Sequence, residues 1–200
     1  FRSHPDYREV LDVLDMQLVQ YGSALIQRRQ TFAEELGEIV HRIHSQLSGG
    51  QEEMELKYEP NVTVDAFAHM LFANRERDMR LKTTATGPHR DDISFVVNGV
   101  DIRKFGSQGQ QRTAALSLKL SEIELVKRLI GDTPVLLLDD VLSELDSGRQ
   151  NYLLNSIENI QTLITCTGLD EFVNHRFSIN RIYKVTDGSV TVENKQEADR

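Results

Sequence analysis

The sequence predicts an α/β protein in which a mostly parallel sheet with flanking helices is joined to a helical arm or lobe. The first observation is the unbroken apolar run from Val135 to Leu138, which is typical of a strand buried on both faces of a parallel sheet. The second is the pair of carboxylates, Asp139 and Asp140, at the carboxyl end of that strand, where open α/β sheets bind ligands. The third is a continuous helical pattern that begins near Asp6.

The composition is that of a globular chain. Its 200 residues, 39% hydrophobic and 27% charged, suffice for the core of one domain, or of one domain and part of another. No apolar run is long enough to cross a bilayer, and we find no signal peptide. The single cysteine, Cys166, excludes an internal disulfide and predicts a reducing, cytoplasmic environment. The net charge of −8 argues against a surface devoted wholly to nucleic acid but permits a local basic patch. Because the chain begins with Phe1 inside a helical pattern, we expect it to be part of a longer protein.

One long helix is predicted from Asp6 to about Leu47. Its apolar residues recur at spacings of three and four, as in a coiled-coil seam, and the seam resumes in a shifted register after Phe32. The seam consists of Leu11, Leu14, Leu18, Tyr21 and Leu25, and then of Leu36, Val40, Ile43 and Leu47. Two interpretations remain open: an arm that needs a partner helix from an upstream segment, or an amphipathic helix that lies on a globular core.

The residues after this helix contain a misleading string. Leu-Ser-Gly-Gly-Gln at 47–51 matches the signature loop of ABC-type ATPases, in which a helix follows the loop. Here the alternating residues from Glu53 to Tyr58 follow, and they predict a half-buried strand. We therefore interpret residues 48–51 as a Gly-Gly helix stop and turn.

A second helix is predicted from Val62 to about Lys82. We divide the chain at its end, into a helical arm or lobe with one inserted strand (residues 1–82) and a second domain (residues 83–200). The basic residues near this boundary are Arg75, Arg77, Arg80 and Lys82. They either complement the helix dipole or bind DNA phosphates, although Glu76 and Asp78 dilute the patch.

Residues 86–92 form an unusual loop that leads into a strand over residues 93–97. Asn98-Gly99 is a strong hairpin signal, and residues 100–102 are expected to pair back across it. Within the loop we expect His89 to be a loop or cap residue. Arg90 is a better candidate for a charge contact across an interface.

A third helix is predicted to open within residues 105–113 and to end at Gly131. Leu116, Leu120, Ile123 and Ile130 are its expected buried stripe. The cluster at its start consists of Ser107, Gln108, Gly109 and Gln110. A helix N-terminus offers free N–H groups and a positive dipole end, so this cluster is either a phosphate-binding site or a plain serine N-cap.

The two carboxylates after the leucine run suit magnesium-nucleotide chemistry. Asp139 is predicted to hold the metal, mainly through bound water, and Asp140 to orient the attacking water. The alternative is a strand end capped by turn-forming aspartates. Downstream, we expect a helix capped by Ser147, a strand from Gln161 to Thr165 and a hairpin across Asp187-Gly188. The polar tail from Glu193 is predicted to be disordered.

Four strings of sequence resemble the C-terminal half of the RecF family, recombination mediators within the class of ABC-type ATPases that includes SMC proteins. They are GPHRDD at 87–92, FGSQGQQRT at 105–113, LLLDDVLSELD at 136–146 and ITCTG at 164–168. The resemblance implies that residues 83–200 are half of an ABC-type ATPase head. It implies a signature loop of Ser107, Gln108, Gly109 and Gln110, which binds ATP, and a Walker B pair of Asp139, the metal ligand, and Asp140, the catalytic residue.

The same resemblance implies a D-loop that crosses a dimer interface, with Arg90 as a further interface residue. This loop consists of Ser143, Glu144, Leu145 and Asp146. Many ABC-type ATPases place a switch histidine after the next strand. Here Thr165 and Thr167 stand in that region, and the family's use of hydroxyl residues implies that they contact the γ-phosphate.

The phosphate-cradling motif G-x-x-x-x-G-K-[ST] does not occur in these 200 residues. We therefore expect the chain to carry half of a nucleotide site and to be inactive alone, while the full-length parent is a weak DNA-dependent ATPase. The resemblance implies ATP and Mg²⁺ as cofactors and an ATP-dependent homodimer. It also implies binding to double-stranded DNA and to single-strand/double-strand junctions, and partnership with RecR and RecO, in recombinational repair of gapped DNA and the SOS response. The alternatives are another SMC-like DNA ATPase head and a non-catalytic interaction module.

Overall fold

The computed structural model describes residues 6–142, 145–166 and 180–193. They fall into two compact units that divide between Thr133 and Pro134. The predicted functional boundary between residues 82 and 83 is a different division, and it stays a prediction.

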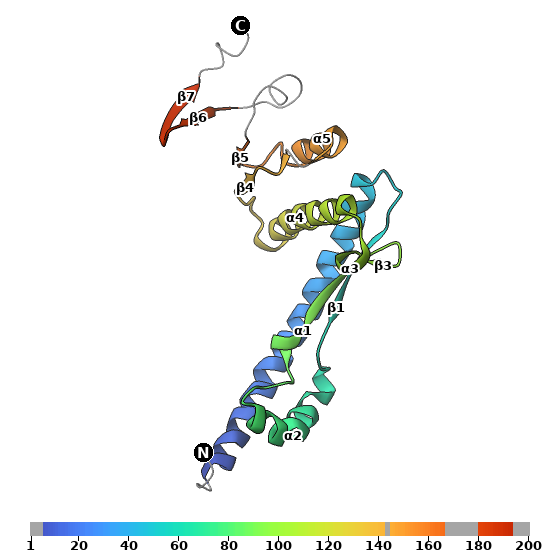
Figure 1. Ribbon diagram of the computed structural model, residues 1–200, viewed down its shortest axis with the longest axis vertical. Coiled ribbons are helices and arrows are strands. Elements are labelled where there is room, and N and C mark those ends of the chain that lie inside the picture. The colour runs from blue at the N-terminus through green and yellow to red at the C-terminus, as the bar shows by residue number, and fades with distance from the viewer. Residues whose placement is uncertain (1–5, 143–144, 167–179, 194–200) are drawn as a thin grey trace. The chain divides into compact units, whose positions relative to one another are not determined.

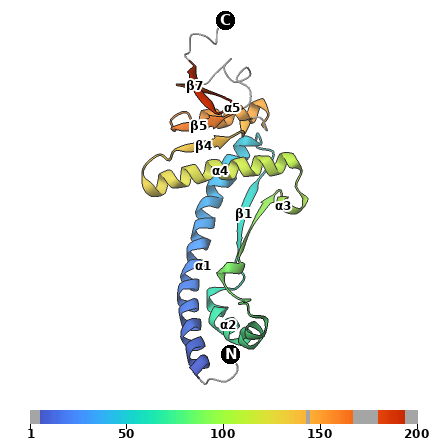
Figure 2. The same ribbon diagram turned by 60° about the vertical axis from the view of Figure 1, so that its left-hand side comes forward.

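The first unit is organised around α1 (Asp6–Leu47), the long helix that the periodicity predicts. Its other elements are β1 (Met54–Glu59), α2 (Val64–Leu81), the 3₁₀ turn η1 (Pro88–Arg90), β2 (Asp92–Val97), β3 (Val100–Asp101), α3 (Ile102–Phe105) and α4 (Gln108–Ile130). In Figures 1 and 2, α2 lies beside the N-terminal part of α1, whereas α4 crosses its C-terminal part. The long helix therefore packs against α2 near its N-terminus and against α4 near its C-terminus.

Strands β1, β2 and β3 form an antiparallel sheet in that order. Strand β1, which starts in the predicted arm, pairs along its whole length with β2, with Met54 opposite Val97 and Glu59 opposite Asp92. The predicted hairpin is confirmed: Asn98 and Gly99 both have positive φ angles, of 48° and 83°, as the tight turn requires. β3 ends at Asp101, so Ile102 starts α3 and does not continue the predicted pairing.

The two halves of the α1 seam differ in burial. Leu36, Val40 and Ile43 are buried, so the C-terminal half lies on a core, as one of the two interpretations expects. In the N-terminal half the seam is uncovered: Leu14, Leu18, Tyr21 and Leu25 are exposed. The helix then ends in the predicted turn, where Gly49 and Gly50 have φ angles of 65° and 77°.

Helix α4 has the predicted limits. Ser107 is its N-cap, and Gly131 is a left-handed C-cap with a φ of 73°. Leu116 and Leu120 are buried as expected, but Ile130 is 71% exposed. The prediction for Ile130 was wrong because the last turn of the helix extends beyond the residues that cover its buried face, whose last fully buried member is Leu125.

The second unit contains a parallel pair, β4 (Leu136–Asp139) and β5 (Thr162–Thr165), joined through α5 (Ser147–Ser156). A separate antiparallel hairpin, β6 (Ile182–Thr186) and β7 (Ser189–Glu193), turns at Asp187 and Gly188 as predicted. The α/β class and the parallel pairing are confirmed. The tail after Glu193 lies outside the described residues.

Two predictions about this unit were wrong. Leu138 is buried, but Leu137 is 71% exposed, and Leu163, its partner in the register, is 55% exposed. Only one face of the β4–β5 pair is therefore covered by the described residues. The N-cap of α5 is Asp146 and not Ser147, because the Asp146 carboxylate accepts the N–H of Arg149 at 3.0 Å.

Candidate nucleotide interface

The N-terminus of α4 is held by a reciprocal capping box. The Ser107 hydroxyl oxygen accepts the backbone N–H of Gln110 at 3.2 Å, and the Gln110 side-chain oxygen accepts the N–H of Ser107 at 3.0 Å. Within the described residues, the N–H groups of Gln108 and Gly109 have no acceptor, and the Ser107 hydroxyl proton has none either. All three residues are exposed. The serine N-cap is therefore confirmed, and three donors stay available at the positive end of a helix dipole, an arrangement that fits a phosphate.

The approach to this helix is tightly packed. A Cβ atom on Gly106 would lie 2.6 Å from the carbonyl oxygen of Ile102, so only glycine fits there. The Gln111 side chain donates to the same carbonyl at 2.9 Å. A Cβ atom on Gly109, in contrast, would meet just the Ser107 hydroxyl among the atoms described, at 4.0 Å. The start of α4 is therefore closely packed at Gly106, whereas the space beside Gly109 is open.

Two residues that the sequence analysis missed support this cluster from behind. Glu52 accepts the side-chain N–H of Gln110 at 3.0 Å, and its second oxygen lies 3.1 Å from Nε2 of His44. His44 is completely buried on α1. No local signal marks either residue, because the contact between Glu52 and Gln110 joins positions 58 residues apart.

In the second unit, Asp139, Asp140 and Thr165 come together at the carboxyl ends of the parallel strands. Asp139 pairs with Thr165 in the register, and the Thr165 hydroxyl donates to the Asp139 carboxylate. The N–H of Asp140 lies 3.1 Å from that hydroxyl oxygen and 3.2 Å from the Thr165 carbonyl oxygen. Strand β4 ends at Asp139, and Asp140 has a left-handed φ of 50°. The direction of the Asp140 side chain is therefore set by the backbone of a turn, and not by the alternation of side chains along a strand.

The exposed carboxylate of Asp139 fits a magnesium ion that is held mainly through water. The described residues contain no group of three or more His, Cys, Asp or Glu side chains arranged to hold a metal. Such a site needs ligands from water and from nucleotide phosphates, which is the usual way Mg²⁺ binds.

The other predicted site residues are dispersed. Leu145 is half-buried, and Asp146 caps α5; the N–H of Arg149 and its guanidinium lower the pKa of the Asp146 carboxyl group. Arg90 is exposed and makes no ion pair in the described part of the chain. Ser143, Glu144 and Thr167 lie outside the described residues.

The basic end of α2 divides into two kinds of residue. The Arg75 guanidinium pairs with Asp12, at 2.7 Å, and with Asp15, both on α1. Arg75 therefore fixes α2 against α1. Arg77, Arg80 and Lys82 are exposed, and none of them forms an ion pair among the residues described here.

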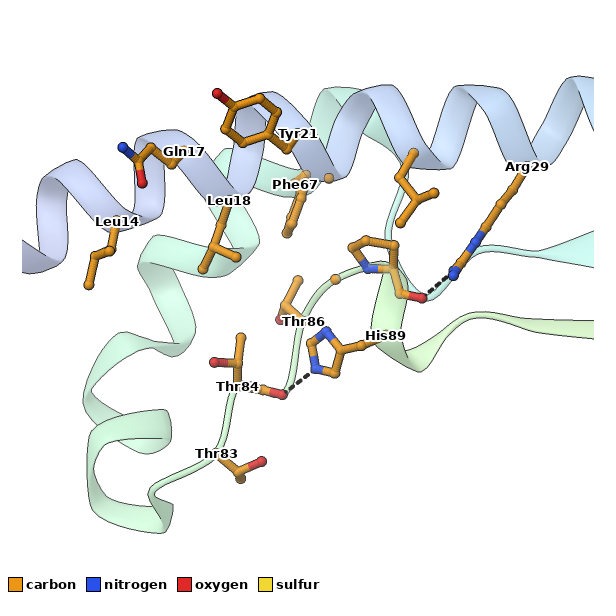
Figure 3. Close-up of a pocket in the computed structure, with 14 residues that line it drawn as sticks. Leu14, Gln17, Leu18, Tyr21, Arg29, Phe67, Thr83, Thr84, Thr86 and His89 are labelled. Atoms are coloured by element: carbon orange, nitrogen blue, oxygen red, sulfur yellow. Dashed lines mark hydrogen bonds between the residues drawn. The ribbon is translucent and has the colours of Figure 1, made fainter.

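The loop that carries GPHRDD packs against α1 and closes one side of an apolar groove of about 850 Å³ (Figure 3). On the α1 side the groove is lined by Leu14, Leu18 and Tyr21 of the exposed seam. His89 lies in the 3₁₀ turn η1 of this loop, as the predicted loop position allows, and its Nε2 lies 2.7 Å from the Thr84 carbonyl oxygen. Asp91 anchors the loop: its carboxylate accepts from Arg29 at 2.9 Å, from the N–H of Asn61 at 2.9 Å and from the Tyr58 hydroxyl.

No family model matches the chain, but individual proteins do. The DNA replication and repair protein RecF of Lachnospira eligens is 59% identical over 186 residues, which are 93% of this chain and 51% of that protein. RecF of Agathobacter rectalis is 59% identical over 188 residues, 94% of this chain and 52% of that protein. The chain thus spans about half the length of the curated relatives it matches.

A solved structure of the recombination mediator protein RecF with ATP, described as part of the RecFOR pathway, matches the fold with a TM-score of 0.80 at 34% identity. The match covers 93% of this chain and 51% of that one.

The described part of the chain contains no helix with the length and apolar character that a membrane span requires.

Proposed function

Because the chain is homologous to RecF proteins over nearly its whole length, we propose that it is the C-terminal part of a RecF-like DNA-binding ATPase. The parent acts in the cytoplasm in recombinational repair of gapped DNA and in the SOS response. It binds double-stranded DNA and single-strand/double-strand junctions, and it works with RecR and RecO. In this role the chain supplies half of a nucleotide site, and a second copy of the parent completes it.

The N-terminus of α4 supports this proposal most directly, because three donors at the signature-like residues have no acceptor in the described part of the chain. The Ser107 hydroxyl and the N–H groups of Gln108 and Gly109 donate to phosphate oxygens of ATP held by the other protomer. Since each protomer offers this surface to its partner, ATP joins the two heads. Gln110 holds Ser107 in place through the capping box.

Asp139, Asp140 and Thr165 serve the nucleotide bound to their own protomer. Asp139 would hold Mg²⁺ mainly through bound water, and the ion would neutralise phosphate charge. The Asp140 carboxylate orients the attacking water and accepts its proton. Thr165 fixes the Asp139 carboxylate and the Asp140 backbone with one hydroxyl group. In this role Thr165 also contacts the γ-phosphate.

Sedimentation of the full-length parent tests this function. We expect a monomer without nucleotide and with ADP, and a dimer with ATP and Mg²⁺ that binds gapped DNA. A parent that stays monomeric with ATP, or that dimerises equally without it, contradicts the proposal. The second outcome indicates the alternative of a non-catalytic interaction module.

A further inference from the structure

We propose that Glu52 is a positioning residue for the ATP interface, which fixes the side-chain amide of Gln110 and connects it to the buried His44 of α1. This inference rests on the proposed function, because it assigns a role to Glu52 in the dimer that ATP holds together. The residue lies in the turn after α1, outside every motif that the sequence analysis singled out.

A continuous chain of hydrogen bonds joins α1 to the start of α4. It runs from the N–H of Ser107 to the Gln110 side-chain oxygen (3.0 Å), and from the Gln110 side-chain nitrogen to Glu52 (3.0 Å). It continues at His44, whose Nε2 donates to the Glu52 carboxylate (3.1 Å) and whose Nδ1 donates to the Ser117 hydroxyl (3.0 Å), so both ring nitrogens carry a proton. The signature-like serine is therefore connected to the interior of the first unit.

Glu52 determines which way the Gln110 amide points. A carboxylate only accepts hydrogen bonds, so it holds the amide NH₂ group toward itself and leaves the amide oxygen for the N–H of Ser107. If the amide turned over, its NH₂ group would face that N–H, and half of the capping box would be lost. The Ser107 hydroxyl would then be held only through its bond to the backbone N–H of Gln110.

His44 holds Glu52 in turn. The Ser117 hydroxyl donates its proton to the Thr113 carbonyl oxygen at 2.8 Å, so it must accept from Nδ1 of His44. This bond fixes the ring and points Nε2 at Glu52. Because His44 is completely buried, losing either bond leaves a polar group without water, which is costly. These hydrogen bonds thus connect the end of α1 to the start of α4.

The test uses the full-length parent and three variants at neighbouring positions. Glu52→Ala removes the acceptor and should weaken ATP-dependent dimerisation by about tenfold, the effect of one lost hydrogen bond at a binding surface. Glu52→Gln keeps an oxygen for Gln110, and its NH₂ group can donate to Nε2 of His44 once that nitrogen has released its proton, so the variant should dimerise within about twofold of the wild type. Glu53→Ala, which removes the same charge from an exposed neighbour, should have no effect.

Three measurements separate positioning from general stability: the dissociation constant of the ATP dimer, ATP binding by the monomer and the melting temperature without nucleotide. ATP binding by the monomer should stay unchanged, because the interface acts on the partner's nucleotide. A double-mutant cycle tests the coupling between Glu52 and Gln110 directly: in a Gln110→Met background, Glu52→Ala should cause little further loss of dimerisation. This comparison distinguishes positioning from general stability even if Glu52→Ala lowers the melting temperature.

Equal dimerisation by wild type and Glu52→Ala would overturn the inference. So would a Glu52→Gln variant as defective as Glu52→Ala, or an undiminished effect of Glu52→Ala in the Gln110→Met background. If the wild-type parent itself does not dimerise with ATP, the proposed function fails, and that result is distinct from all three.

Discussion

The hydroxyl group of Thr165 donates to the carboxylate of Asp139, and the same oxygen lies 3.1 Å from the backbone N–H of Asp140. One side chain on β5 thereby fixes both acidic residues at the end of β4. The register of the parallel pair, in which Asp139 stands opposite Thr165, produces this arrangement. The two acidic residues nevertheless have different surroundings, because only Asp140 has left the strand.

We predict that the two acidic residues fail differently in the full-length parent. Asp140→Asn should lower ATP hydrolysis by ~10²–10⁴-fold while ATP still binds, because the amide cannot accept the proton of the attacking water. Asparagine tolerates the left-handed backbone at this position, so the fold should be kept. Asp139→Asn should weaken Mg-nucleotide binding and, with it, the dimer. Turnover assays and sedimentation with ATP distinguish the two variants, and normal hydrolysis by Asp140→Asn would contradict the assignment.

Ser107→Arg should abolish ATP-dependent dimerisation, because a long cation at the N-cap destroys the capping box and fills the space in front of the free N–H groups. The matched control is Gly50→Asn in the misleading Ser-Gly-Gly-Gln string. Gly50 is exposed, no atom of the residues that the structure describes lies within 4 Å of an added Cβ atom, and asparagine accepts its positive φ. The dimer dissociation constant should change only for Ser107→Arg. Equal loss in both variants would mean that the string at 47–51 also belongs to the interface.

The basic end of α2 should contribute to DNA binding through Arg77 and Arg80. Replacing both with Ala should weaken binding to all sequences alike and flatten the plot of log K against log salt by roughly one unit for each lost phosphate contact. Binding titrations at several salt concentrations measure this slope. Arg75→Ala should instead lower the melting temperature, because it breaks the pairs with Asp12 and Asp15. An unchanged salt dependence of DNA binding in the double variant would contradict this prediction and would favour the alternative, that these cations only complement the helix dipole.

Stability at high pH should depend on Tyr58. Burial, together with its hydrogen bond to Asp91, raises the pKa of Tyr58 to about 12, above the value of about 10 expected in the unfolded chain. Its contribution is therefore fully present below pH 10 and is lost as the pH rises toward 12. The loss is at most about 2–3 kcal/mol, and less where solvent screens the partly exposed ring. Urea unfolding from pH 9 to 11 should show a steeper decline for wild type than for Tyr58→Phe; parallel curves would contradict this.

The isolated chain should have no magnesium-dependent ATPase activity, since its 200 residues contain no G-x-x-x-x-G-K-[ST] loop to cradle the β-phosphate. A sensitive phosphate-release assay checks this, with the Asp140→Asn chain as a control for contaminating enzymes. Turnover that disappears in the control would show that these residues form a complete site.

Several features follow from local sequence alone. The limits of α1 and α4, the stop at Gly131 and the turns at Asn98-Gly99 and Asp187-Gly188 are all present as predicted. Each depends on residues a few positions apart, through helical periodicity, a cap or a backbone that favours positive φ. The acidic pair at the end of β4 was predictable for the same reason, because a short apolar strand followed by two carboxylates is a local pattern.

Only the tertiary structure decided which side chains meet. The contact of Glu52 with Gln110, the burial of His44 and the pairing of Arg75 with Asp15 join positions that are remote in the chain, and residue type does not reveal them. The exposure of Leu137 was equally hidden, because an apolar run indicates a strand but not which of its faces are covered by the rest of the fold. Local interactions determine where helices, strands and turns begin and end, whereas burial and hydrogen-bond partners depend on how these elements pack.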